Sequence, residues 1–386
     1  MKKQTTDYWF TIEPYVFIGL TNQCALLYNT LDGNFLESCK KEVLELLHEV
    51  IQKANHGVTL LTSDQYNNES VRNFVTELRE KFMGDIIDVN LSKGKPVQLL
   101  PFFDFEVPNK LDVYKRHSFS SSRNILENLL EVNIHLSSET NVEELILFLE
   151  AIPERTTFNI IGNIENVMNC HEILNYLNQG SSLKNMVCSY KCLISLQPEF
   201  NNNFSYKIHI DFPIDMQQWE QSRSALINKD LPVEYIFDVS SFEDCQKAES
   251  FIAMFRIEKY RLNPVYTGKN IHFFEDYVFL SKEDILSMHI TIKDLFFHQS
   301  INSYDFGKIH ILPTGDVYAN LNHPMLGNIA TDTIYDIVQK EIDNGVSWFN
   351  IRNHAPCNNC VYQWLCPSPS DYEIAIGRTN LCHIKK

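Results

Sequence analysis

Four cysteines near the C-terminus are the residues whose type and spacing point most directly to chemistry. Three of them have the spacing Cys-x2-Cys-x5-Cys, and fifteen residues separate the third from the fourth. A Cys-x2-Cys turn lets two sulfurs converge on one centre, and four thiolates complete the ligand set of a zinc or a [4Fe-4S] site. The spacing therefore predicts a metal site at Cys357, Cys360, Cys366 and Cys382. It leaves open whether this site holds zinc or a [4Fe-4S] cluster.

Two histidines, His354 and His383, flank this run, and either could replace a cysteine as a ligand. The alternative interpretation is four unrelated reduced thiols, which the clustering disfavours. The remaining cysteines are scattered over segments that we expect to be strands and helices. In a long chain without a secretion signal this predicts free thiols rather than a disulfide framework, at Cys24, Cys39, Cys170, Cys188, Cys192 and Cys245.

The charge of the chain limits its partners. With 33 basic and 49 acidic residues its net charge is -16, which argues against nucleic acid or an anionic membrane as the main partner and is compatible with a basic peptide. No apolar segment follows the first lysines, and no window of membrane-spanning length is free of charge. We therefore expect a cytoplasmic protein.

The elements that must position these residues begin with a compact α+β unit. Strands are predicted over 15–21 and 25–29, and the Asp32-Gly33 hairpin signal leads into a third strand at 34–37. Apolar residues at helical spacing predict a helix over 43–51, followed by a strand over 58–62 and a helix over 71–82. The expected order is three strands, a helix, a strand and a helix.

A different pattern follows, in which β-rich runs alternate with amphipathic helical stretches. Such alternation indicates βα units around a parallel sheet, and about six units make an incomplete (β/α)6-type barrel rather than a closed eightfold one. The runs are 132–136, 158–161, 185–189, 206–212, 235–239 and 260–263. Glu131, Asn133 and His135 alternate along the first of these strands, and we assign them no role.

The last part of the chain is predicted to be a hairpin over 309–318, a helix over 334–342 and the cysteine segment. The fold class is thus α/β, an incomplete barrel between a winged-helix-like α+β domain and a small metal-binding domain. The predicted boundaries are 1–100 for the first domain, 101–125 for a linker, 126–305 for the partial barrel and 306–386 for the C-terminal domain.

These parts, taken in order, resemble a known family. A barrel of βα units followed by Pro-Thr-Gly-Asp-Val-Tyr at 313–318, Leu-Gly-Asn-Ile at 326–329 and the cysteine run is similar to radical SAM peptide-maturation enzymes that end in a SPASM domain. The resemblance spans about residues 120–386. It implies a [4Fe-4S] cluster, in preference to zinc, on the four C-terminal cysteines.

The sequence departs from this family at two sites. Radical SAM catalysis needs Cys-x3-Cys-x2-Cys directly after the first barrel strand, where the loop after Leu136 reads Ser-Ser-Glu-Thr-Asn. A second auxiliary cluster also lacks ligands, since Asn320 and Ser370 occupy two of its positions. These departures resemble the pseudo-radical-SAM proteins beside peptide-maturation systems of Bacteroidales-type bacteria, and imply a pseudo-enzyme without catalytic residues or bound SAM.

The N-terminal unit resembles the PqqD-like element with which such maturases hold a leader peptide. The resemblance implies β-augmentation at the edge formed by the third strand, at Asn34, Phe35, Leu36 and Glu37. Phe74, Leu78 and Phe82 could form an apolar wall beside it. For Phe74 and Leu78 we prefer burial in the core, since a stripe at helical spacing is usually a buried face.

The function predicted from these features is a non-catalytic accessory protein of ribosomal peptide (RiPP) maturation. It would bind a precursor peptide and a radical SAM or other peptide-modifying enzyme, but neither nucleic acid nor a membrane. Two alternatives remain: a redox-active or SAM-independent peptide-modifying enzyme that uses the cluster, and a zinc-stapled scaffold.

Overall fold

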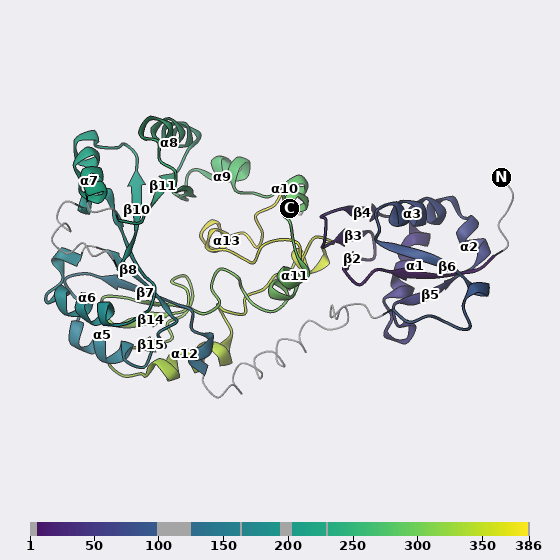
Figure 1. The fold of residues 1–386 in the computed structure, drawn as a ribbon, viewed down its shortest axis with the longest axis horizontal. Helices are drawn as coiled ribbons and strands as arrows, with labels where there is room; N and C mark the ends of the chain where they lie inside the picture. The colour runs from purple at the N-terminus through teal and green to yellow at the C-terminus, as the bar shows by residue number, and fades with distance from the viewer. Residues whose placement is uncertain (1–5, 99–124, 163, 194–202, 229–230, 385–386) are drawn as a thin grey trace.

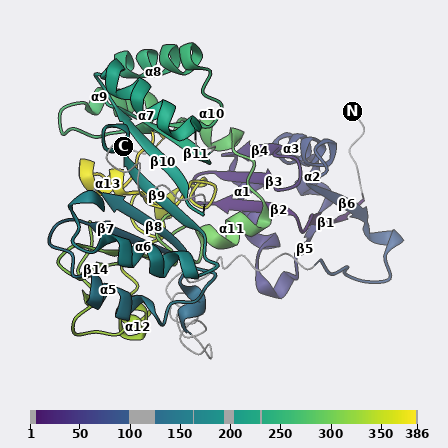
Figure 2. The ribbon, with the colours of Figure 1, turned by 60° about the vertical axis from the view of Figure 1, so that its left-hand side comes forward.

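The computed structural model describes residues 6–98, 125–162, 164–193, 203–228 and 231–384. Almost all of the predicted linker, 101–125, lies outside these residues. Figure 1 shows an N-terminal unit at one end of the molecule and a parallel-sheet unit at the other, with α10 (Lys282–Ser287), α11 (Ile292–His298) and α13 (Asp371–Ile376) between them. Figure 2 shows the N-terminal unit and the parallel-sheet unit from a second direction. Among the described residues, no helix is both long and apolar enough to cross a membrane.

The N-terminal unit contains two antiparallel three-stranded sheets. In one, β1 (Tyr8–Ile12) lies between β5 (Val58–Leu61) and β6 (Gly84–Asp88). The other has the order β2-β3-β4, with β2 (Val16–Leu20), β3 (Ala25–Asn29) and β4 (Phe35–Ser38). The three predicted strands of this second sheet are confirmed, whereas β1 and β6 were not predicted, because pairing between distant segments creates them.

Helices cover these sheets and complete a core. They are α1 (Lys41–Val50), α2 (Ser63–Asn67) and α3 (Glu69–Glu80). Leu27 and Leu36 from the second sheet pack with Phe10, Leu47 and Val75 in one buried cluster. Both predicted helices are confirmed, and their apolar stripes face this cluster.

The prediction of free thiols is wrong for two cysteines. Cys24 precedes β3 and Cys39 follows β4, and the two form a disulfide with Cα atoms 4.2 Å apart. Cross-strand pairing of Ala25 with Ser38 places the flanking residues opposite one another. Register between strands, which residue spacing does not reveal, brought these sulfurs together.

The parallel α/β sheet is confirmed. Six consecutive strands pair in parallel and in chain order. They are β7 (Glu131–Leu136), β8 (Thr157–Gly162), β9 (Lys184–Ser189), β10 (Ser205–Asp211), β11 (Val233–Val239) and β12 (Tyr260–Pro264). The connecting helices are α5 (Val142–Leu149), α6 (Cys170–Gln179), α7 (Met216–Asn228) and α8 (Phe242–Phe255).

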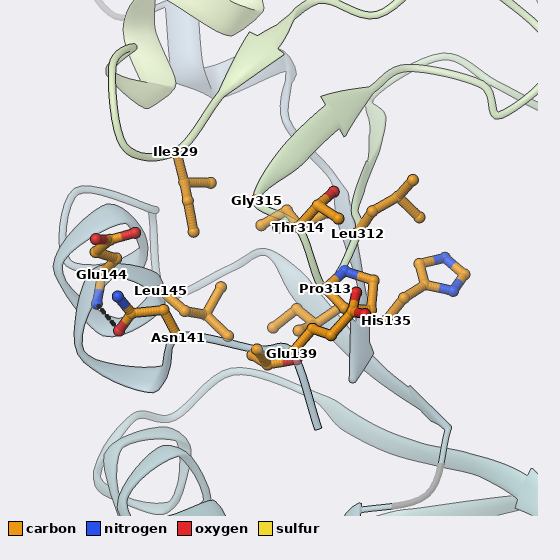
Figure 3. A pocket seen from close by; sticks show the side chains of 13 residues that line it. His135, Glu139, Asn141, Glu144, Leu145, Leu312, Pro313, Thr314, Gly315 and Ile329 are labelled. Carbon is orange, nitrogen blue, oxygen red and sulfur yellow. Dashed lines mark hydrogen bonds between the residues drawn. The ribbon is translucent and has the colours of Figure 1, made fainter. Parts of the chain in front are cut away.

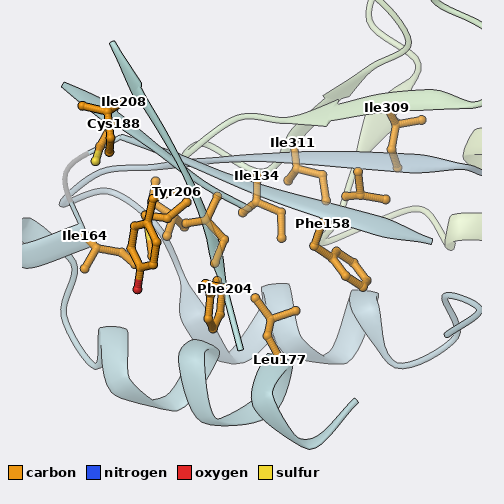
Figure 4. Packing of buried hydrophobic residues seen from close by; sticks show 14 of the residues in the cluster. Ile134, Phe158, Ile164, Leu177, Cys188, Phe204, Tyr206, Ile208, Ile309 and Ile311 are labelled. Carbon is orange, nitrogen blue, oxygen red and sulfur yellow. The ribbon is translucent and has the colours of Figure 1, made fainter. Parts of the chain in front are cut away.

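The two faces of this sheet differ in polarity. Ile134, Phe158 and Tyr206 point from one face toward the helices, where Leu177 packs against them (Figure 4). Because side chains alternate along a strand, Glu131, Asn133 and His135 point from the opposite face. The helix-covered face supplies the core and the other face is polar.

The C-terminal part extends the same sheet. Strand β13 (Lys308–Ile311) pairs in parallel with β7, and β14 (Asp316–Tyr318) and β15 (Gly327–Asn328) follow as antiparallel strands. The predicted hairpin and the helix α12 (Ile334–Asn344) are confirmed. Helix α9 (Ile271–Tyr277) precedes α10, and a single 3-10 turn, η7 (Cys357–Asn359), opens the cysteine segment.

Candidate metal centre and peptide-binding edge

Backbone hydrogen bonds shape the segment that carries the first three cysteines. The Cys360 N–H donates to the Cys357 carbonyl at 3.1 Å, and the Cys366 N–H donates to the Tyr362 carbonyl at 3.0 Å. The fourth cysteine returns to this region through a β-bridge between Leu280 and Cys382. Two separate parts of the C-terminal domain thus supply the predicted ligands.

The four thiols influence one another electrostatically. Burial raises the pKa of Cys366 to about 12; Arg352 opposes this rise, and the other three cysteines, Cys360, Cys382 and Cys357, add to it. Burial also raises the pKa of Cys357, against the effect of Arg352. A nearby metal cation would lower these pKa values, because it stabilises the thiolate, which is the form that binds metal.

Two nitrogen donors lie next to these sulfurs. The Arg352 Nη1 is 3.9 Å from the Cys357 Sγ, and the Asn380 Nδ2 donates to the Cys382 Sγ at 3.1 Å. Arg352 is buried and held by an ion pair with Glu373 at 2.8 Å. Hydrogen bonds and positive charge next to thiolates are what tune metal and iron-sulfur sites.

The donor set therefore fits a thiolate-bound metal in its chemistry. Within the described ranges, however, no three His, Cys, Asp or Glu side chains form a group that could hold a metal ion. Of the flanking histidines, His383 places its Nε2 2.8 Å from the Glu275 carbonyl, and its ring packs against Phe279. The four-cysteine ligand set stays a prediction, with its members gathered in one neighbourhood.

The predicted peptide-binding residues lie on β4 and in the turn before it. Among the strands that the structure describes, β4 is an edge strand that pairs with β3 alone. The Asn29 N–H donates to the Asn34 carbonyl, so the alternating pattern of an antiparallel pair directs the backbone groups of Phe35 and Glu37 away from β3. Lys81 donates from its Nζ to the Phe35 carbonyl at 2.6 Å.

The side chains of β4 divide between its two faces. Leu36 is buried in the N-terminal core, whereas Phe35 is 36% exposed. Among the helix residues considered as a wall, Phe74 and Leu78 are buried and therefore core residues. Phe82 is 75% exposed and follows the helix with a left-handed φ of 55°, an uncommon conformation for a bulky residue.

The second face of the sheet β2-β3-β4 packs against the C-terminal part of the chain. Phe17, Leu26 and Tyr28 form one buried cluster with Tyr362 and Leu365. The Tyr362 hydroxyl also donates to the Glu37 carboxylate, and the Lys282 Nζ lies 2.5 Å from that carboxylate. Glu37, predicted to bind a peptide, thus uses its side chain to contact Tyr362 and Lys282.

A cleft of about 820 Å³ lies between the polar face of the parallel sheet and the C-terminal domain. Glu131, Asn133 and Asn263 line it from the sheet, and Arg352 and Tyr372 line it from the opposite side. A row of amides crosses the same face, since Asn185 donates to Asn159 and Asn159 donates to Asn133. The alternation seen in the first barrel strand therefore marks a polar surface across several strands.

A histidine on this face has the surroundings of an acid–base group. The His209 Nδ1 is 2.9 Å from Asp238 Oδ2, and Asp238 Oδ1 accepts a 2.7 Å hydrogen bond from Asn263. All three residues lie near the carboxyl ends of their strands, where α/β folds place ligands. The sequence did not predict this arrangement, although polar residues alternate along β10.

The loop after β7, where radical SAM catalysis would need cysteines, closes on itself. The Ser137 N–H donates to Thr140 Oγ1 at 3.0 Å. A pocket of about 80 Å³ adjoins it, lined by His135, Glu139 and Gly315 among others (Figure 3). The His135 Nε2 lies 3.2 Å from His310 Nδ1.

The two residues at second-cluster positions take part in polar networks. Asn320 donates to the carboxylates of Asp305 and Asp371, and Ser370 forms a capping box with Glu373 at the start of α13. Burial raises the pKa of Asp305 to about 6. Amide and hydroxyl groups here stabilise the C-terminal domain.

Neither the known family models nor the curated protein sequences match this chain. Its structure is similar to that of Streptococcus suis SuiB bound to S-adenosylmethionine, with a TM-score of 0.38, 12% identity and coverage of 97% of this chain and 98% of that chain. It is also similar to native anSMEcpe with bound AdoMet and Cp18Cys peptide, with a TM-score of 0.42, 10% identity and coverage of 61% and 88%. A third likeness, to native anSMEcpe with bound AdoMet, has a TM-score of 0.40, 12% identity and coverage of 61% and 88%.

These likenesses concern the fold alone. The prediction that the chain is not an enzyme is contradicted, because the similar structures have bound AdoMet. The missing cysteine motif after β7 had suggested a pseudo-enzyme, and one motif is too narrow a basis for that conclusion.

Proposed function

We propose that this chain is a peptide-maturation protein that binds a precursor peptide at β4 and holds a [4Fe-4S] cluster on Cys357, Cys360, Cys366 and Cys382. The observation that carries the proposal is the contact between the two sites, made by Glu37 of β4 and Tyr362 of the cysteine segment. A bound peptide would then lie beside the metal-binding domain. From there it reaches the polar cleft of this chain or a partner peptide-modifying enzyme.

The edge of β4 offers backbone groups for an added strand. Within the described residues, the Phe35 N–H, the Glu37 N–H and the Glu37 carbonyl form no hydrogen bond with another part of the chain. A peptide strand would pair with them and displace Lys81 from the Phe35 carbonyl. Helix α3 contacts β4, and Phe82 comes shortly after this helix. The exposed ring of Phe82 offers apolar surface to a peptide side chain.

Peptide binding can be tested without knowing the natural precursor. A display library of random twelve-residue peptides serves as the probe, and the affinity of selected peptides is measured by fluorescence anisotropy. The variant Lys81→Met frees the Phe35 carbonyl and should tighten binding about threefold to tenfold. Phe35→Pro removes an N–H that points away from β3 and should weaken peptide binding by at least threefold to tenfold.

The matched control is Lys93→Met, which changes a lysine outside β4 and α3. Its affinity should equal that of the unaltered protein. Selected peptides whose affinity is unchanged in both Lys81→Met and Phe35→Pro would refute binding at this edge.

The metal site is tested by elemental analysis of protein purified without oxygen. About four iron and four sulfide per chain are expected for one [4Fe-4S] cluster, and one zinc for the alternative. Cys366→Ser should lose this metal, while Cys245→Ser, which alters a buried cysteine of α8, should retain it. Equal metal content in the two variants would refute the proposed ligand set.

A second candidate function is acid–base catalysis on the peptide at the polar face. The observation that favours it is the hydrogen-bonded series of His209, Asp238 and Asn263, in which a carboxylate orients an imidazole. Selected peptides would be incubated with the protein and followed by mass spectrometry. A mass change that is lost in His209→Gln would support this function, and no change in any condition would exclude it for those peptides.

A further inference from the structure

The residues between Cys360 and Cys366 form part of the surface on which the N-terminal unit rests, and Ile285, Ile290 and Leu295 form another part. The buried cluster that joins the two parts contains Tyr362 and Leu365, and Cys360, Val361 and Trp364 pack at its margin. All of these residues belong to the five-residue spacer of the cysteine run or to its ends. The predicted metal ligands and the docking surface are therefore parts of one short segment.

Backbone contact at this surface is very close. A Cβ atom added to Gly19 of β2 would lie 2.0 Å from the carbonyl oxygen of Val361. No side chain fits there, so β2 lies directly against the spacer. A displacement of the spacer by about an ångström would disturb this contact, because packed surfaces lose much of their attraction at small gaps.

Polar contacts surround the apolar cluster. Tyr28 of β3 donates its hydroxyl hydrogen to the Met288 carbonyl at 2.9 Å and accepts from the Ile290 N–H at 3.1 Å. Glu37 of β4 accepts from Tyr362 and pairs with Lys282. Residues 282–290 therefore hold β3 and β4, and Tyr362 of the cysteine segment adds a further contact to β4.

The spacer also forms other hydrogen bonds, including one from the Gln363 side chain to the Arg352 carbonyl. The Leu365 N–H donates to the Tyr362 carbonyl at 2.9 Å, and His298 bonds the Trp364 carbonyl through its Nδ1 at 2.9 Å. A metal bound by Cys360 and Cys366 would fix both ends of the spacer. Metal sites of this kind supply folding free energy to the loops that carry their ligands.

We propose that occupancy of the four-cysteine site controls the docking of the N-terminal unit and, through Glu37, the peptide-binding edge of β4. The inference rests on the proposed metal site and adds a regulatory role to it. When the site is empty, the spacer opens locally and the sheet β2-β3-β4 loses its support. Because coupling is reciprocal, undocking of the N-terminal unit also weakens metal binding by the same factor.

Hydrogen exchange of the full chain tests this coupling without any substrate. The protein is compared after anaerobic loading with iron and sulfide, after loading with Zn²⁺, and after removal of metal by a chelator. Metal removal should accelerate exchange about tenfold or more in β2, β3, β4 and residues 361–365, with no change in β8 and β9. Metal content is measured on the same samples.

The variant Tyr362→Phe tests the reverse direction. It removes the hydrogen bond to Glu37 and keeps the ring in the cluster, so metal transfer to a competing chelator should become about threefold to tenfold faster. Tyr335→Phe is the matched control, since it alters a 46% exposed tyrosine of α12 outside the docking cluster. Its transfer rate should equal that of the unaltered protein.

The outcomes separate the two proposals. A protein that takes up neither metal refutes the metal site and the inference with it. A protein that takes up metal, but whose β2–β4 exchange is the same with and without it, overturns the inference alone. Faster exchange on metal removal, together with faster transfer in Tyr362→Phe, supports both.

Discussion

The Tyr362 hydroxyl donates its hydrogen to the Glu37 carboxylate and joins residues 325 positions apart in the sequence. Burial and the neighbouring carboxylate raise the pKa of Tyr362 well above its usual value. The phenol therefore remains a donor throughout the accessible pH range. This bond connects β4 to the cysteine segment.

Removal of this bond should destabilise the docked N-terminal unit. A hydrogen bond to a charged group contributes about 1.5 to 3 kcal/mol, so Tyr362→Phe and Glu37→Gln should each lower the free energy of unfolding by about that amount or less. The double variant should cost little more than either single one. Urea unfolding followed by tryptophan fluorescence measures the cycle, and additive effects would show that the residues do not interact.

Gly19 should tolerate no side chain. Gly19→Ala places a methyl group against the Val361 carbonyl and should cost about 1 to 3 kcal/mol, as overpacking does elsewhere. Gly94→Ala is the matched control, since nothing lies within 4 Å of an added Cβ there. Thermal unfolding curves of the two variants measure the difference, and equal midpoints would contradict the close approach of β2 to the spacer.

The disulfide between Cys24 and Cys39 should stabilise the N-terminal unit. It closes a loop with a sequence separation of 15, for which loss of chain entropy in the unfolded state predicts about 2 to 4 kcal/mol. Reductant should therefore lower the unfolding midpoint of the unaltered protein. A variant with both cysteines changed to serine should unfold at this lower midpoint with or without reductant. If reductant still lowered the midpoint of that variant, the effect would come from other cysteines.

Acid should weaken the contact between His135 and His310. Burial lowers the pKa of His310 to about 4, and the neighbouring His135 contributes to this decrease. The unfolded chain binds a proton near pH 6.5 and the folded chain does not, so stability falls as pH decreases from about 6.5 to about 4, by at most about 1.4 kcal/mol per pH unit. His310→Gln should flatten this part of the stability profile, measured by urea unfolding between pH 4 and pH 8.

Much of the parallel sheet could be predicted because its strands are set by local composition. The six β-rich runs from Val132 to Asn263 coincide with β7 to β12, since a strand buried on one face needs β-branched and aromatic residues whatever lies beside it. The helix around Ile337 and the hairpin after Lys308 followed from equally local signals. Spacing alone also identified the four C-terminal cysteines as a candidate ligand set.

Only the tertiary structure decided which distant residues meet. The Cys24–Cys39 bond depends on strand register, the contact of Glu37 with Tyr362 on domain docking, and the alignment of His209, Asp238 and Asn263 on three neighbouring strands. The short strands β1 and β6 exist because they pair with each other. Composition and periodicity describe what a segment buries, whereas the identity of its partner is set by packing across the whole chain.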